Sequence, residues 1–281
     1  MKVLLVPSDM ADVQASARYL ASRLTIAGID VCVQPPENPE TSIVPVEELS
    51  LVVPMGGDGT FLAATRLIGF APVPLLAFNY GTLSFLAGSP ERDEVELICD
   101  ALAGDVVFER RSTVDISIEE EDGAIQEFTA LNEMAYTRGT SGRVVEYAYG
   151  INGTTIAHLK ADGLIVSTPT GSTGYALSAG GPIVSPAYTG LVAIPVAPHA
   201  LNTRAIVLAP SDVLEATIVG SRAQDSSLFI DGRTIDIERP RKIIARRGEN
   251  EVLFALGGGD FFNNVSRVFF GGPYPDLDEI G

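Results

Sequence analysis

The sequence predicts an N-terminal Rossmann-like α/β domain, a C-terminal β-sandwich-like domain and a closing helix. Strand and helix signals alternate over the first hundred residues, which is typical of a parallel sheet with helices on its faces. After about Gly104 the pattern changes to short extended segments with turns at sandwich-like spacing. Residues 260–270 again have the pattern of an amphipathic helix. We therefore expect domains over residues 1–104 and 105–259 and a closing segment over 260–281.

Apolar runs and helix-stop residues define the elements of the first domain. Lys2–Val6 is a strand, and the helix after it is expected to stop at Gly28, because glycine favours a helix C-terminus. Pro54 is awkward in a buried central strand, although a position near the strand end tolerates it. In order, the sequence predicts strand 2–6, helix 9–27, strand 30–33, strand 51–55, helix 59–68, strand 74–78 and helix 91–102.

The second half is predicted to consist mainly of short strands. Asn152-Gly153 between two extended segments is a strong signal for a two-residue hairpin turn. Glu121-Asp122-Gly123 indicates another turn. The expected extended segments are 114–120, 124–136, 147–151, 154–159, 191–196, 213–219, 227–230, 242–245 and 252–256.

Composition excludes several classes of partner. The net charge of −17 would repel nucleic acid and anionic membranes at long range, so neither is expected as a partner. No apolar run approaches the roughly 20 residues of a membrane span, and the first residues lack the apolar core and cleavage site of a signal peptide. Cys32 and Cys99 lie far apart in apolar segments, which favours buried thiols in a reducing cytoplasm.

Gly56-Gly57-Asp58-Gly59-Thr60 places a carboxylate in a glycine-rich turn between an apolar strand and a helix. Glycines at such a junction let backbone N–H groups approach a phosphate, and the helix N-terminus adds a favourable dipole. A carboxylate repels phosphate, so Asp58 makes chemical sense if it binds a metal or accepts a proton from an attacking hydroxyl. The alternative is a glycine-rich turn in which Asp58 only caps the helix.

A second candidate segment runs from Asp162 to Pro182, where an apolar strand leads into a loop rich in hydroxyls and glycines. Such a loop suits the sugar and phosphate groups of a nucleotide, and Tyr175 is available to stack or to hydrogen-bond. An ordinary Ser/Thr/Gly loop is the alternative. The dipeptide Asn132-Glu133 offers acceptors for ribose hydroxyls, although a solvated strand face is the better explanation for these two residues considered alone. His199 is expected to be structural.

Taken together, these segments resemble the NAD kinases, which phosphorylate the adenosine ribose 2′-hydroxyl of NAD to give NADP. The resemblance lies in Gly56–Thr60, in Asn132-Glu133, and in the run from Asp162 to Pro182 with its core Thr168–Thr173. Residues 79–86 are similar to the family's Asn-x-Gly-x-Leu-Gly-Phe-Leu segment. The similarity covers nearly the whole chain, in the family's order. It implies that the closing segment returns to the first domain.

The resemblance also implies roles for individual residues. Asp58 is the expected general base, and Asn132 and Glu133 are expected to hold the NAD. The remaining residues expected to bind NAD or ATP are Gly57, Gly59, Thr60, Phe61, Arg143, Lys160, Asp162, Thr170, Thr173, Gly174, Tyr175, Ala176, Leu177, Ser178 and Arg233. Three departures stand out: Gly174 where the family usually has Ala, Ser84 in place of a glycine, and Arg233 where many members have Gln.

The expected substrates are NAD with ATP or polyphosphate, and the expected cofactor is a divalent metal, Mg²⁺ or Mn²⁺, with no metal ligand predicted. The metal is expected because the chain has no Walker-type Lys loop and few cations for a triphosphate. Related members imply a homodimer or homotetramer in which a neighbouring subunit completes the NAD site. Two alternatives are a lipid kinase of the diacylglycerol type, which shares the Gly-Gly-Asp-Gly-Thr turn, and a catalytically silent dinucleotide sensor.

Overall fold

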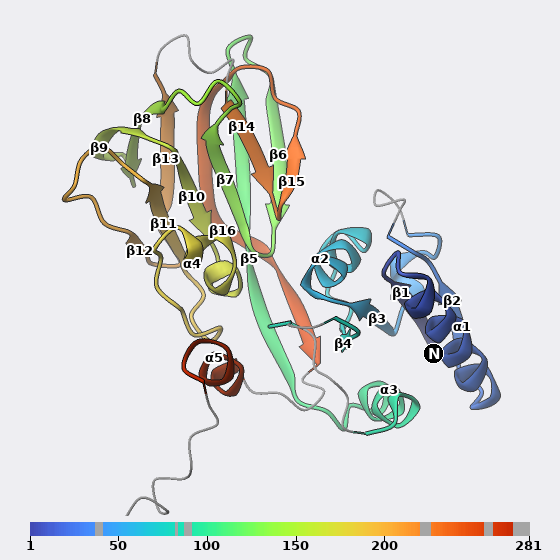
Figure 1. Cartoon of the computed structure of the whole chain (residues 1–281). Helices are drawn as coiled ribbons and strands as arrows, with labels where there is room; N and C mark the ends of the chain where they lie inside the picture. The colour runs from blue at the N-terminus through green and yellow to red at the C-terminus, as the bar shows by residue number, and fades with distance from the viewer. Residues whose placement is uncertain (37–41, 82–83, 87–91, 220–225, 256–260, 272–281) are drawn as a thin grey trace, which may run out of the picture. The chain divides into compact units, whose positions relative to one another are not determined.

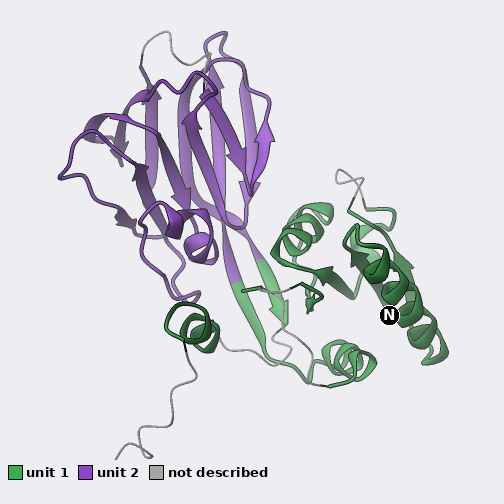
Figure 2. Ribbon diagram, viewed as in Figure 1, with its two compact units in different colours: residues 1–110, 252–281 green, residues 111–251 purple. Residues whose placement is uncertain are grey.

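The computed structural model describes residues 1–36, 42–81, 84–86, 92–219, 226–255 and 261–271. The chain forms two compact units, which Figure 2 colours separately: unit 1 contains Met1–Arg110 and Val252–Gly281, and unit 2 contains Arg111–Glu251. The chain passes from one unit to the other inside two long strands, β5 (Phe108–Glu120) and β16 (Pro240–Ala255). The expected domain boundaries at 104 and 259 remain a prediction.

Unit 1 contains a parallel four-stranded sheet in the order β2-β1-β3-β4 (Figure 1). This confirms the predicted α/β class. The elements of the unit, in chain order, are β1 (Lys2–Pro7), α1 (Ala11–Ile26), β2 (Asp30–Val33), the 3₁₀ turn η1 (Val46–Glu48), β3 (Leu51–Gly56), α2 (Asp58–Leu67), β4 (Phe78–Asn79), α3 (Glu94–Ala103) and α5 (Phe261–Phe269).

The central strands β1 and β3 are buried along their lengths, as expected for parallel strands covered by helices. Pro54 lies inside β3 and is buried, opposite Val6 of β1. The N–H of Val52 donates to the Pro74 carbonyl, so Pro54, two residues on, directs its nitrogen to the same side. Its missing donor therefore falls on the side of the two-residue strand β4 and leaves the pairing with β1 intact.

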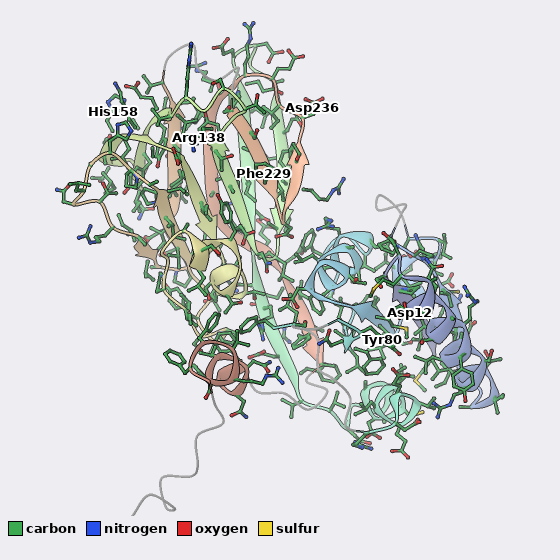
Figure 3. The ribbon with its side chains drawn as sticks, viewed as in Figure 1. Asp12, Tyr80, Arg138, His158, Phe229 and Asp236 are labelled. Carbon is green, nitrogen blue, oxygen red and sulfur yellow. The ribbon has the colours of Figure 1, made fainter. Side chains whose placement is uncertain are left out.

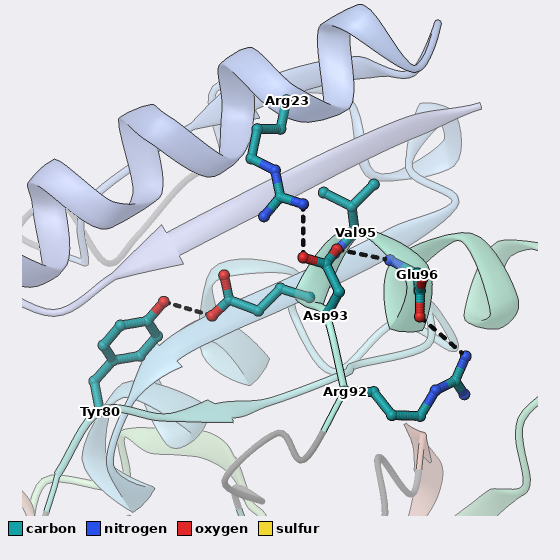
Figure 4. A network of polar contacts seen from close by, with 7 residues as sticks. Arg23, Tyr80, Arg92, Asp93, Val95 and Glu96 are labelled. Atoms are coloured by element: carbon teal, nitrogen blue, oxygen red, sulfur yellow. Dashed lines mark hydrogen bonds and ion pairs between the residues drawn. The ribbon is translucent and has the colours of Figure 1, made fainter.

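A polar network attaches α3 to its neighbours (Figure 4). The Asp93 carboxylate caps α3 by accepting the Val95 and Glu96 N–H groups, and it pairs with Arg23 of α1 at 2.6 Å. The Tyr80 hydroxyl donates to Glu94 at 2.6 Å, and burial raises the pKa of this phenol.

The chain returns to unit 1 at its C-terminal end, as the resemblance implied. The Leu75 N–H donates to the Leu253 carbonyl and the Ala255 N–H donates to the Leu75 carbonyl. Phe254 meets Phe61 of α2 edge to face at 5.4 Å, and Phe269 of α5 stacks on Phe85 at 5.5 Å. The predicted closing helix is confirmed as α5.

Unit 2 consists of two antiparallel six-stranded sheets, in the orders β12-β11-β10-β7-β14-β15 and β6-β5-β16-β13-β8-β9 (Figure 1). This confirms the β-sandwich. Residues of both sheets, including Tyr136 and Tyr147, form one buried core. The elements not yet given are β6 (Ile125–Ala130), β7 (Glu133–Arg138), β8 (Val145–Ile151), β9 (Thr154–Ala161), β10 (Gly163–Ser167), η2 (Thr170–Thr173), α4 (Tyr175–Ser178), β11 (Leu191–Val196), β12 (Ile206–Leu208), β13 (Val213–Ile218), β14 (Ser226–Ile230) and β15 (Arg233–Ile235).

Four expectations need correction. The strand expected over 74–78 is confined to β4 at Phe78–Asn79, with isolated bridges at Leu75. The segments 242–245 and 252–255 belong to one strand, β16, in which Gly248 has no side chain to strike Thr113 of the adjacent β5: a Cβ there would lie 2.0 Å from Thr113 Oγ1. The segment 124–136 is broken into β6 and β7. Cys99 is exposed and Cys32 is only partly buried, so neither is the buried thiol expected.

The hairpin at Asn152-Gly153 is confirmed, with φ values of 51° and 76°. No helix in the described part of the chain is long and apolar enough to cross a membrane. Glu91, Leu256 and Asp260, at the ends of expected elements, lie outside the described residues, as do Thr82 and Leu83 of the segment 79–86.

Candidate functional site

The glycine-rich turn in unit 1 places Asp58 in the first turn of α2, directly after β3. Gly56 must lack a side chain, because a Cβ there would lie 2.3 Å from Thr60 Oγ1. A Cβ on Gly57 or Gly59 would meet nothing within 4 Å, so the backbone of these two residues is open on the side that a side chain would cover. The turn therefore presents open backbone beside a helix N-terminus, which is suited to an anion.

The carboxylate of Asp58 is held by the segment that follows β4. Its Oδ1 accepts the Ser84 hydroxyl, the Phe85 N–H at 3.1 Å and the Leu86 N–H at 3.0 Å. Among the described residues, Oδ2 receives only a share of the Phe85 N–H, at 3.2 Å. Because a carboxylate oxygen has two lone pairs, Oδ2 keeps the capacity to accept another proton donor. Asp58 is therefore more than a helix cap: it is fixed in orientation with one oxygen available.

Thr60 and Phe61, the other expected ligand residues of this turn, have buried side chains. Phe61 is 1% exposed and packs against Phe254, so its side chain serves the core of unit 1.

In unit 2, Asn132 and Glu133 lie where the chain enters β7, and Asp231 ties this entry in place. Oδ2 of the Asp231 carboxylate accepts the Leu131 N–H at 2.9 Å. Oδ1 accepts the N–H groups of Asn132 at 2.7 Å and Glu133 at 3.3 Å. The Asp231 N–H in turn donates to the Glu133 carbonyl at 3.0 Å. Asp231 is buried and has a positive φ of 48°. One residue about a hundred positions away thus shapes the Asn132-Glu133 turn.

Glu133 is buried beside the Asp231 carboxylate. Burial raises the pKa of Glu133 to about 8, and the charge of Asp231 adds to the rise. Glu133 Oε2 and Asn132 Oδ1 are buried and have no hydrogen-bond partner among the described residues. Buried polar atoms of this kind are rare without a partner, so these two are candidates for direct contact with a ligand.

The loop 168–174 packs against the same turn. The Thr168 hydroxyl donates to the Leu131 carbonyl at 2.5 Å, and the Thr168 N–H donates to the Asn132 carbonyl at 2.8 Å. A Cβ on Gly171 would lie 2.3 Å from the Asn132 carbonyl oxygen, whereas one on Gly174 would lie 3.5 Å from Glu133 Oε2. Gly174 is therefore the loop residue whose missing side chain leaves space beside Glu133.

The residues after this loop form α4, a single short turn. Tyr175 is 43% exposed, and Ser178 is also exposed. Ala176 is buried against Ile165, Val192 and Ile194, which holds the turn on the sheet. Thr170 is buried, while Thr173 and Leu177 are partly exposed. The phenol of Tyr175 and the hydroxyl of Ser178 are thus the open polar groups of this turn.

The expected charged ligand residues of unit 2 are spread over other strands. Asp162 pairs with Arg138, labelled in Figure 3, at 3.3 Å. Glu146 pairs with His158, also labelled, at 3.3 Å and with Lys160 at 3.7 Å. Arg143 and Arg233 are exposed. No contact gathers these groups with Glu133; the structure brings together Asn132, Glu133, Gly174 and the unpredicted Asp231.

Comparisons with known proteins show the family of this chain. Residues 15–106 match the family description "ATP-NAD kinase N-terminal domain", and residues 131–256 match "ATP-NAD kinase C-terminal domain". A curated NAD kinase from Ralstonia nicotianae is 37% identical over 81% of this chain and 76% of the relative. The chain belongs to the NAD kinase family. A family member from Bordetella avium is 33% identical over 94% of this chain and 93% of its own length.

Two solved structures have the same fold as this member of the NAD kinase family. A yeast NADH kinase complexed with NADH superposes with a TM-score of 0.86 at 20% identity, over 99% of this chain and 89% of that one. An NAD kinase from Archaeoglobus fulgidus in complex with ATP superposes with a TM-score of 0.76 at 24% identity, over 96% and 98%.

Sequence reasoning missed two contributors to the site. Asp231-Gly232 was visible as a turn signal between two strands, but no sequence pattern connects it to Leu131. Ser84 was noted only as a departure from the family, and its bond to Asp58 depends on how residues 84–86 fold back onto α2.

Proposed function

We propose that this protein is an NAD kinase that transfers the γ-phosphoryl group of ATP to the adenosine ribose 2′-hydroxyl of NAD, giving NADP and ADP. The observation that carries the proposal is the Asp58 carboxylate, held at Oδ1 by residues 84–86 and open at Oδ2, at the start of a helix. Membership of the NAD kinase family supplies the substrates.

In the proposed reaction, the ribose 2′-oxygen attacks the γ-phosphorus while Asp58 Oδ2 accepts the hydroxyl proton. The bond from the γ-phosphorus to the bridging oxygen breaks, and ADP leaves. Phosphoryl transfer depends mainly on positioning and on neutralising charge, so the three donors that fix Asp58 Oδ1 are as important as its basicity. The open backbone of Gly57 and Gly59 is proposed to face the phosphates.

We propose that Asn132 and Glu133 bind the NAD through their unpartnered oxygens, and that Tyr175 and Ser178 offer it a ring and a hydroxyl. Arg143, Lys160, Asp162, Thr170, Thr173, Gly174 and Arg233 are proposed to contribute further contacts, as their places in the family pattern suggest. Thr60, Phe61, Ala176 and Leu177 are proposed to act mainly through their backbone and packing.

A divalent metal is proposed to arrive with the phosphates of ATP. Among the described residues no group of three or more His, Cys, Asp and Glu side chains could hold a metal ion. Mg²⁺ commonly keeps several waters and binds through substrate phosphates, so a preformed protein cage is not needed. The metal supplies neutralisation of the phosphate charge, which this acidic chain provides poorly by itself.

We also propose a cytoplasmic homodimer or homotetramer whose NAD sites are shared between subunits. Mixing Asp58→Asn subunits with Asp162→Ala subunits tests the sharing. If one subunit's Asp58 and another's Asp162 serve the same site, some mixed sites regain both groups, and activity exceeds that of either parent. Strictly additive activity in verified mixed oligomers would show that each subunit builds its own site.

A coupled assay of NADP formation tests the proposed reaction, with ATP or polyphosphate as donor and NAD or NADH as acceptor. Asp58→Asn is expected to lower kcat at least ~100-fold while NAD affinity stays within a few-fold, because general-base removal costs ~10²–10⁴-fold. Turnover at the wild-type rate by purified Asp58→Asn protein would show that Asp58 is not the general base. NAD binding without any phosphoryl transfer would instead favour the silent sensor, and phosphorylation of diacylglycerol would favour the lipid kinase.

A further inference from the structure

The carboxyl groups of Asp231 and Glu133 have opposite environments although they lie in the same buried region. Asp231 accepts three consecutive backbone N–H groups, those of residues 131–133. Such donors stabilise the charged form of a carboxylate, so Asp231 carries the negative charge of the pair. Glu133 is 7% exposed and its Oε2 has no partner among the described residues.

Among the described residues Glu133 forms no ion pair with a Lys, Arg or His side chain, and Arg233, at the start of β15, is exposed. On β10, Ser167 lies opposite Glu133, and its hydroxyl donates to the Thr168 carbonyl at 2.9 Å, with the Asn132 carbonyl as a second, more distant acceptor at 3.3 Å. The 170–174 loop approaches Glu133 with Gly174, which has no side chain. The Asp231 carboxylate approaches from the β14–β15 turn, and its charge adds to the effect of burial in raising the pKa of Glu133. A second negative charge here would be both desolvated and repelled.

We propose that Asp231 is a positioning residue that holds the Asn132-Glu133 turn and keeps Glu133 as an uncharged carboxylic acid, which donates a hydrogen bond to an oxygen or nitrogen acceptor of the dinucleotide. This inference rests on the proposed function, because it deepens the role of Glu133 in binding NAD. The space beside Glu133 Oε2 left by Gly174 is where the acceptor is placed.

The inference has a direct consequence for the pH dependence of NAD binding. The pKa of Glu133 is raised to about 8, so the acid form predominates at neutral pH and is lost as the pH rises through that value. If only the acid form binds, the Kd for NAD stays constant below pH 7 and rises about tenfold for each pH unit above 8. A carboxylate that accepted ribose hydroxyls would give the opposite sign, with weaker binding at low pH.

Calorimetric titration of NAD in the absence of ATP, from pH 6 to pH 9.5, tests the inference with three variants of the full chain. Glu133→Gln keeps the size and the donor without the titration, so it is expected to bind NAD within a few-fold of wild type at pH 6.5 and to lose the alkaline transition. Asp231→Asn tolerates the positive φ and removes the charge. It is expected to weaken NAD binding and to move the transition to lower pH. Asp236→Asn, an exposed carboxylate just after β15 (Figure 3), is the matched control and should behave as wild type.

In the titrations, the inference is overturned by wild-type binding of NAD that is independent of pH between 7 and 9.5, or by a loss of NAD binding in Glu133→Gln at pH 6.5. A purely structural Asp231 would weaken binding equally at every pH without moving the midpoint. The infrared C=O band of a protonated acid at pH 7, absent in Glu133→Gln, gives a readout that needs no ligand. If the band is present and NAD fails to bind, the proposed function fails; if the band is missing while NADP is formed, only the inference fails.

Discussion

Gly171 and Gly174 offer a matched pair of substitutions in one loop, with opposite expected results. A Cβ on Gly171 would lie 2.3 Å from the Asn132 carbonyl oxygen, 2.6 Å from the Asn132 carbonyl carbon and 2.7 Å from Ser167 Oγ. Two of these atoms are backbone and cannot rotate away. A Cβ on Gly174 would meet the Gly171 carbonyl oxygen at 3.3 Å and Glu133 Oε2 at 3.5 Å, which a small shift accommodates.

The magnitudes follow from these contacts. Overpacking a rigid site lowers the free energy of unfolding by about 1–3 kcal/mol. A Gly→Ala change raises it by about 0.4–1 kcal/mol where the backbone tolerates alanine, because alanine reduces the conformational entropy of the unfolded chain. We expect Gly171→Ala to lower the free energy of unfolding by roughly 1–3 kcal/mol. It should also raise the KM for NAD about 5- to 150-fold, because the Asn132-Glu133 turn must move and a buried polar contact is lost. For Gly174→Ala, we expect a free energy of unfolding within about 1 kcal/mol of the wild-type value.

Urea unfolding measures the stability of each variant, and the coupled NADP assay measures the KM for NAD and for ATP separately. Gly174→Ala serves as the stability control for adding a methyl group to this loop, and it restores the residue that the family usually has. The steric reasoning is refuted if Gly171→Ala unfolds at the same urea concentration as wild type with an unchanged KM for NAD. It is also refuted if Gly174→Ala lowers the free energy of unfolding more than Gly171→Ala does.

Three further predictions concern other parts of the site. Ser84→Ala is expected to lower the free energy of unfolding by about 1–3 kcal/mol, because a buried hydroxyl bonded to the Asp58 carboxylate is lost. An unchanged urea midpoint would show that this hydrogen bond does not stabilise the fold. Activity is expected to vanish when EDTA removes divalent metal and to return with Mg²⁺ or Mn²⁺, and full turnover with metal-free ATP would contradict this. Tyr175→Ala is expected to raise the KM for NAD more than the KM for ATP, by on the order of 1–3 kcal/mol in binding; equal changes in both would argue against an NAD contact.

The local elements were predictable because each depends on a short pattern. Alternating strand and helix signals predicted the α/β unit, and Asn152-Gly153 predicted the β8–β9 hairpin of unit 2, because that turn needs positive φ values. Asp58 was predictable for the same reason: the strand, the glycines and the helix start are neighbours in sequence. The joining of 242–245 and 252–255 into β16 was not predictable, because it depends on the packing of Gly248 against Thr113 of another strand.

The sequence by itself determined the fold class and the family, because the motifs that indicate them are local and can be recognised without knowing how the chain packs. Only the tertiary structure decided the chemical state of the residues at the candidate site. Asp231 reaches Glu133 across about a hundred residues of chain, and the burial of Glu133 is a property of two strands and a loop that meet in space. The same holds for the orientation of the Asp58 carboxylate by Ser84. Hydrogen bonds and desolvation depend on distance in space rather than in sequence, so the charge of a side chain is read only from the folded chain.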